Sequence, residues 1–129
     1  MLLTVAMVIG SMSVVMAGGA EDELLVTPSC SANCDVWCNR YSSTASTHLY
    51  LDKSYDSAST YVSITVTGGR ELGYRELGSD SSSASFDSDL RALADVEVSY
   101  AEVPYMAESY HEASVSISSN DMELTAYYD

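Results

Sequence analysis

The stretch Tyr61-Val-Ser-Ile-Thr-Val-Thr67 alternates apolar and polar side chains without a break. This period of two predicts a β-strand, because successive side chains of a strand point to opposite faces of its sheet. One face would carry Val62, Ile64 and Val66 toward a core, and the other would carry hydroxyl groups toward water. Gly68-Gly69 follows directly and favours a turn, since glycine accepts positive φ. The stretch therefore predicts a half-buried strand that ends in a turn.

The same period of two recurs on both sides of this strand. Residues 96–101 alternate in the same way, and two further alternating runs occupy 114–118 and 122–126. The last two runs predict a terminal β-hairpin with its turn at Ser119-Asn120. About six or seven short strands separated by turn signals predict a mainly β fold, either an antiparallel β-sandwich of immunoglobulin-like architecture or a small barrel.

Four segments lack clear alternation. Residues 41–47 are small and polar and predict a linker or loop, and 79–85 also predict a loop. Arg-Glu-Leu-Gly occurs twice within 70–78, with a period of five that fits neither a helix nor a strand. We interpret this repeat as a hairpin or bulged strand around Gly73. Residues 89–93 fit a single helical turn, capped by one of the Asp or Ser residues at its start.

The first twenty residues, MLLTVAMVIGSMSVVMAGGA, contain no charged side chain. A helix of this length would extend about 30 Å, the thickness of a bilayer core. Gly18 and Ala20 match the small-x-small pattern of a signal-peptidase site, so cleavage would leave Glu21 as the mature N-terminus. The positively charged start typical of signal peptides is missing. We expect residues 1–20 to be a signal peptide or a retained apolar helix, and the body to be secreted or displayed at the cell surface.

The composition indicates one small acidic domain behind this leader. We expect a Cys-containing segment with a Ser/Thr linker over 21–47 and a β-sandwich domain over 48–129. The chain has 19 acidic and 5 basic residues, which gives a net charge of −14. Nucleic acid is not expected as a partner, because phosphate binding needs clustered Lys and Arg. A membrane contact is expected only through residues 1–20, if they are retained.

All three cysteines, Cys30, Cys34 and Cys38, lie in the run CSANCDVWC. Their C-x3-C-x3-C spacing differs from the C-x2-C pairs of structural zinc sites. On a helix the three side chains would line one stripe. In an exported chain we expect one intrachain disulfide with one thiol left over. The alternatives are an intermolecular disulfide that links a second chain and, least favoured, a metal site.

Candidate site residues elsewhere in the chain are few. Asp80, Asp87 and Asp89 offer oxygen ligands of the kind that Ca²⁺ prefers, although they do not match an EF-hand and a solvated loop is the preferred interpretation. The two histidines are His48 and His111, and we expect both at the surface. No other metal and no organic cofactor is expected.

The sequence carries no nucleophile motif and no phosphate-binding glycine loop, which favours a non-enzymatic role. We expect a structural, adhesive or interaction domain that binds a protein or carbohydrate partner through faces rich in its ten tyrosines. One alternative is a pilin-like filament subunit that polymerises through a retained apolar helix. Another is a small secreted hydrolase or metal-dependent enzyme that uses His111, Glu112 or the acidic loop.

Overall fold

The computed structural model describes residues 14–16, 18–53, 55, 57–69, 73–86 and 90–128. These residues form two antiparallel sheets and contain no helix. The strands are β1 (Val14–Met16), β2 (Gly19–Thr27), β3 (Cys30–Cys38), β4 (Ser42–Tyr50), β5 (Ala58–Gly68), β6 (Arg75–Ser85), β7 (Arg91–Ser99), β8 (Pro104–Val115) and β9 (Ser118–Tyr127).

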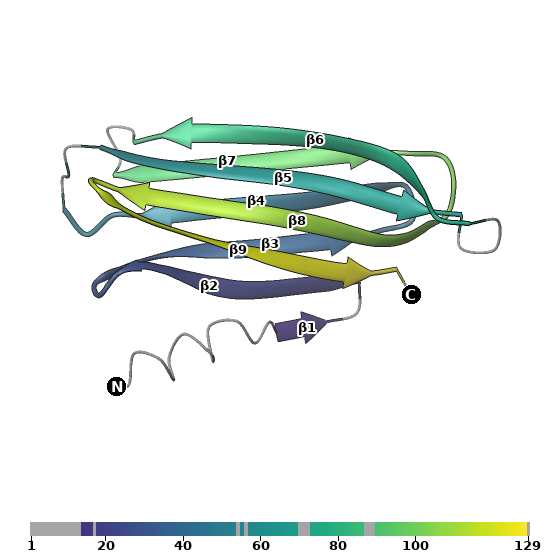
Figure 1. Cartoon of the computed structure of the whole chain (residues 1–129), viewed down its shortest axis with the longest axis horizontal. Coiled ribbons are helices and arrows are strands. Elements are labelled where there is room, and N and C mark those ends of the chain that lie inside the picture. Colours follow the sequence, from purple (N-terminus) through teal and green to yellow (C-terminus); the bar gives the residue numbers. More distant parts are fainter. Residues whose placement is uncertain are drawn as a thin grey trace.

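The two sheets stack face to face as a sandwich (Figure 1). One sheet has the order β1-β2-β3-β4-β7, and the other has the order β6-β5-β8-β9. At the two long sides of the sandwich, β6 contacts β7 and β2 contacts β9. The predicted mainly β, two-sheet antiparallel fold is confirmed, and its strands belong to two separate sheets rather than to one closed barrel.

The core lies between the sheets and consists mostly of small aliphatic side chains. In β5, Val62, Ile64 and Val66 are each at most 1% exposed, as the alternation in this stretch predicts. They face β4 and β7 of the opposite sheet, which contribute mostly smaller residues. The buried residues of those two strands are Ser43, Ala45, Thr47, Leu49, Ala92, Ala94, Val96 and Val98.

Three predictions of irregular or helical structure are wrong. Residues 42–47 are not a linker but the first part of β4, which lies between β3 and β7. Residues 79–85 are not a loop but part of β6, and residues 91–93 begin β7 rather than continue a helical turn. In β4 the alternation exists between small inward side chains such as Ala45 and hydroxyl-bearing outward ones. Because most inward and outward residues of β4 have similar hydropathy, this part of the sequence shows no apolar–polar alternation that would predict a strand.

Both predicted hairpins form, but one turn lies elsewhere. β8 and β9 pair as expected, with the turn at Ser116 and Ile117 instead of Ser119-Asn120. Ile117 is fully exposed and Ser116 has a φ of 54°, so a serine, which turns favour, and an isoleucine, which they do not, make this turn. The bulged hairpin near Gly73 is confirmed. β5 pairs with β6, and the register shift places Leu77 as an extra residue in β6.

The leader falls mainly outside the described residues. Residues 1–13 and 17 are not described, so the helix predicted for them stays a prediction. Val14–Met16 are not helical, because they form β1 and pair with β2 over Gly19–Glu21. Ala20 is fully buried at the start of β2. Among the described residues, no helix is long and apolar enough to cross a membrane.

The close approach of β6 to β7 gives a test of the packing between the sheets. A Cβ atom on Gly78 would lie 2.5 Å from Cγ1 of Val98, which is buried and stiff at χ1. We expect Gly78→Ala to lower the free energy of unfolding by about 1–3 kcal/mol through overpacking, measured by urea denaturation. The control is Ser81→Ala on the exposed side of β6, which should change it by less than about 0.5 kcal/mol. Equal effects of the two substitutions would contradict the close contact.

Candidate functional site

Carboxylates gather on the outer face of the five-stranded sheet. Glu21 on β2 pairs with Asp35 on β3, Asp35 with Ser46 on β4, and Ser46 with Asp95 on β7. Neighbouring strands lie about 4.8 Å apart, so these four residues form one row across the sheet. We call this surface the acidic face and define it by Glu21, Asp35, Ser46, His48, Asp95 and Glu97.

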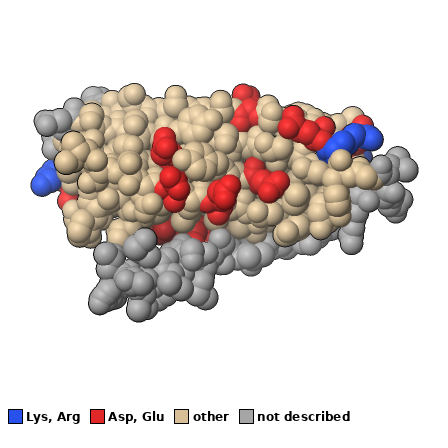
Figure 2. Space-filling view, in the orientation of Figure 1, with Lys and Arg blue, Asp and Glu red and all other residues tan. Residues whose placement is uncertain are grey.

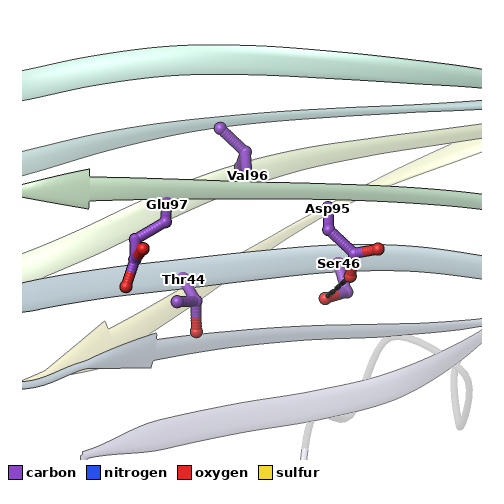
Figure 3. A pocket seen from close by; sticks show the side chains of 5 residues that line it. All are labelled: Thr44, Ser46, Asp95, Val96 and Glu97. Carbon is purple, nitrogen blue, oxygen red and sulfur yellow. Dashed lines mark hydrogen bonds between the residues drawn. The ribbon is translucent and has the colours of Figure 1, made fainter.

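Asp95 accepts two hydrogen bonds within the acidic face. Its Oδ1 atom accepts hydrogen bonds from Ser46 Oγ and from His48 Nε2, each at 2.7 Å. Beside it is a shallow hollow lined by Thr44, Ser46, Asp95, Val96 and Glu97, shown in Figure 3. The carboxylates of Asp95 and Glu97 extend from the same side of β7, while Val96 points to the other side (Figure 3). The hollow therefore presents oxygen acceptors to an incoming ligand.

The carboxylates of this row repel one another, because nearby positive charge neutralises them only in part. Burial raises the pKa of Asp35, and the charges of Glu21 and Asp95 raise it further. His48 and a hydrogen bond from Ser46 offset only part of this rise. The pKa of Asp95 is lowered instead, because the hydrogen bonds from Ser46 and His48 outweigh its partial burial. A cation placed over the row would relieve the repulsion that Asp35 experiences.

A second polar cluster lies inside the sandwich, around His111. Thr47 Oγ1 donates to the carbonyl of Tyr61 at 3.1 Å, so it accepts from His111 Nδ1 at 2.8 Å. Ser109 Oγ then donates to His111 Nε2 at 2.7 Å, a contact shorter than its 3.4 Å distance to the carbonyl of Leu124. The chain of hydrogen bonds assigns the neutral imidazole with its proton on Nδ1.

The His111 cluster is closed to solvent. His111 and Thr47 have no exposed surface, and Ser109 is 4% exposed. Burial lowers the pKa of His111 to about 4, although a backbone hydrogen bond with Ser46 raises it slightly. The surface position predicted for His111 is therefore wrong. The arrangement resembles a serine–histidine pair in its atoms, but it connects two sheets and leaves no room for a substrate.

The other predicted site residues do not come together. Asp80 lies exposed on β6 and accepts a hydrogen bond from the Ser81 backbone, while Asp87 and Asp89 lie outside the part of the chain that is described. Glu112 points away from the core, opposite to its neighbour His111. No group of three or more His, Cys, Asp or Glu residues among those described is arranged to hold a metal ion. The Ca²⁺ site stays a prediction.

The cysteines lie on a strand and not on a helix. Cys30, Cys34 and Cys38 all point inward from β3, because their spacing of four is also a multiple of the strand period. The intrachain disulfide predicted for them is not formed, and all three thiols are free. Each residue is at most 3% exposed. The metal site finds no support among the described residues, since a straight strand spreads the three sulfurs too far apart to share one ion.

Sequence reasoning missed both clusters, but for different reasons. Asp35 and Asp95 occupy outward positions of strands that are far apart in the sequence, so only the pairing through β4 makes them neighbours. A signal for His111 did exist. His111 is an even number of positions away from Ala107, Ala113 and Val115 on the same strand, so all four side chains point to one face. The other three are buried, so the alternation along β8 predicts that His111 is buried too.

No protein-family model matches this chain, and no curated protein matches it in sequence.

The pKa of His111 predicts a stability that depends on pH. Between about pH 6.5 and pH 4 the unfolded chain binds a proton that the folded chain does not, so stability falls as the pH falls through this window. The loss levels off below about pH 4 and amounts to roughly 3 kcal/mol. Urea denaturation at a series of pH values measures it.

Two variants distinguish the contribution of His111 to the pH dependence of stability from the contributions of other titrating groups. His111→Gln keeps one donor and one acceptor but cannot titrate, so its unfolding free energy should lack this slope between pH 6.5 and 4. His48→Gln, at the surface, should keep the slope of the parent chain. The assignment is contradicted if both variants follow the parent profile.

Proposed function

We propose that this protein is an exported, non-enzymatic interaction domain whose acidic face binds a basic polypeptide surface of a partner protein. The observation that carries the proposal is the row of carboxylates Glu21, Asp35 and Asp95, with Glu97 beside it. The two antiparallel sheets support the same role, since paired strands hold outward side chains in fixed positions. Lys and Arg side chains of the partner would neutralise the row and donate hydrogen bonds into the hollow.

The charge distribution supports a cationic partner. Figure 2, in the orientation of Figure 1, shows the side of the four-stranded sheet, where acidic side chains also occupy the middle and Lys and Arg lie toward the ends, so both sides of the sandwich carry negative charge. The net charge of −14 adds a long-range attraction for basic partners and a repulsion for anionic glycans and nucleic acids. A neutral carbohydrate is less favoured, since it would not offset the repulsion between the carboxylates.

The acidic face also differs from the other acidic surface of the sandwich. Glu108 and Glu112 point outward from β8, where Glu108 pairs with two threonines and Glu112 pairs with Tyr61 and Asp121. The acidic face instead combines a carboxylate fixed by two hydrogen bonds with a hollow between β4 and β7. Fixed acceptors cost less conformational entropy on binding than mobile ones. The proposal therefore places the contact on the five-stranded sheet.

The double substitution Asp95→Asn/Glu97→Gln tests the acidic face. The ligand is a short oligolysine peptide, and Trp37 is the fluorescent probe, since it is the single tryptophan and pairs with Thr44 beside the hollow. Loss of two partly exposed charges should weaken binding about fivefold at low salt. The effect should decline as salt is added.

The matched control removes the same net charge from the other sheet. Glu108→Gln/Glu112→Gln leaves the acidic face intact, so we expect less than a twofold change in affinity, in keeping with roughly zero net contribution from remote screened charges. Equal weakening by the two double variants would show attraction to the overall charge and would refute a defined binding face.

The apolar leader supports export, and the strand pairing is compatible with its removal. β1 has three residues and pairs only with Gly19–Glu21. Cleavage after Ala20 would leave the β2–β3 register from Glu21 to Thr27 in place. It would remove the Gly19–Trp37 and Ala20–Val36 pairs, the hydrogen bond from Cys38 N to Gly18 O and the burial of the Ala20 methyl group.

Intact-mass measurement of the chain outside its producing cells tests this step. We expect a mature chain that begins at Glu21. A chain found only inside the cells and still beginning at Met1 would contradict export.

A further inference from the structure

We propose that strand β3 and any disulfide within Cys30–Cys38 exclude each other, so that the protein folds only while these thiols are reduced. The inference concerns the assembly of the fold and is independent of the proposed binding role. It rests on the geometry of β3, the burial of its three sulfurs and the place of β3 inside its sheet.

The cysteines of β3 lie too far apart along the strand to form a disulfide. A strand rises about 3.3 Å per residue, so residues four apart have Cα atoms about 13 Å from each other. A disulfide needs Cα atoms within about 7 Å. Cys30 and Cys38 are twice as far apart as either neighbouring pair. None of the three possible intrachain disulfides is therefore compatible with an extended β3.

Strand β3 cannot bend on its own, because it is an interior strand of its sheet. It pairs with β2 on one side and with β4 on the other, and Cys34 lies between Asp22 and Thr47 in those registers. Closing a Cys30–Cys34 or Cys34–Cys38 bond would break both ladders around the bond. It would also pull Cys34 away from Thr47, which anchors the His111 cluster.

Once β3 has formed, its three thiols are protected from oxidants. Each of the three residues is at most 3% exposed, so an oxidant cannot reach the sulfurs in the folded chain. Burial also raises the pKa of Cys34 to about 12, with a further rise from Asp35 and Asp22, so the reactive thiolate is scarce. Oxidation therefore proceeds through the unfolded chain.

In the unfolded chain the chemistry is ordinary thiol–disulfide exchange with a small disulfide such as oxidised glutathione. The thiolate of one cysteine attacks the disulfide and releases one glutathione thiolate. A second cysteine thiolate attacks the mixed bond and releases the other. The two cysteine sulfurs are oxidised, the glutathione disulfide is reduced, and the two thiol protons end on the released glutathiones or in water. Short separations between the cysteines make the ring closure easy.

A consequence follows for export to an oxidising compartment. Oxidising conditions act on chains that have not yet folded and spare those that have. The order of folding and oxidation then decides how much native protein accumulates. Reduction of the blocked chain restores its ability to fold.

The experiment uses the full-length chain in three arms. Chain unfolded in urea is diluted after treatment with diamide, an azo compound that takes two electrons and two protons from a pair of thiols and leaves no adduct. A second sample is unfolded and diluted with dithiothreitol, and a third is treated with diamide while folded. Near-ultraviolet circular dichroism reports native packing, thiol titration counts free cysteines, and peptide mass mapping locates any disulfide.

We expect the oxidised arm to lose the native signal, to carry a disulfide within 30–38 and to recover on addition of dithiothreitol. The reduced arm should regain the native signal, and the folded arm should keep three free thiols. A monomer with a mapped disulfide within 30–38 and a native spectrum overturns the proposal. So does oxidation of the folded chain as fast as the unfolded one.

The matched control is Cys30→Ala/Cys38→Ala, which keeps Cys34 and cannot form an intrachain disulfide. It should refold equally well with and without prior diamide treatment, at a concentration low enough to prevent dimers. Loss of refolding in this variant after diamide would show damage other than disulfide formation and would overturn the proposal. The three wild-type arms decide the matter by themselves if the variant does not fold.

Discussion

The hydrogen-bonded chain through His111 is the constraint on which the sandwich depends. It joins β8 to β4 and β5 across the core, and each of its members is shielded from water. An unpartnered polar group in such a place costs about 1–3 kcal/mol, so Thr47 and Ser109 must both face inward at the same level as the imidazole. A slip of one residue in β4 would turn Thr47 outward and leave His111 without that partner, and a slip in β8 would turn Ser109 and His111 outward together. The cluster thereby fixes the register of both sheets against each other.

That register decides the chemistry of the outer surface. With Thr47 inward, Ser46 and His48 face water, and the neighbouring strands align Asp35 and Asp95 with them. The same alternation turns Cys34 inward, beside Thr47. The proposed binding face and the proposed dependence on reduced thiols are therefore two results of one arrangement of β3 and β4. Both need the strands to be straight and paired along their full length.

The sequence predicted those strands in which the inward positions hold apolar residues and the outward positions hold polar ones. Residues 61–67 alternate branched apolar residues with hydroxyl residues, and the prediction for them is confirmed. β4 and β6 were missed because their inward positions hold Ser, Thr, Ala or Gly, which resemble loop residues. The spacing of the cysteines fits both a helix stripe and a strand face, so spacing alone could not exclude a disulfide. The candidate site was not predicted, since its carboxylates come from strands separated by up to about 75 residues of chain, far beyond the reach of local patterns.

The sequence by itself determined the fold class, the acidity and the existence of the two hairpins, because these follow from local alternation and composition. Only the tertiary structure decided which strands are neighbours, and with it the row of Glu21, Asp35 and Asp95 and the burial of His111. The physical reason is that strand pairing is set by packing and hydrogen bonds between distant segments. Alternation tells which side chains share a face of one strand, but it carries no information on which strand lies beside it.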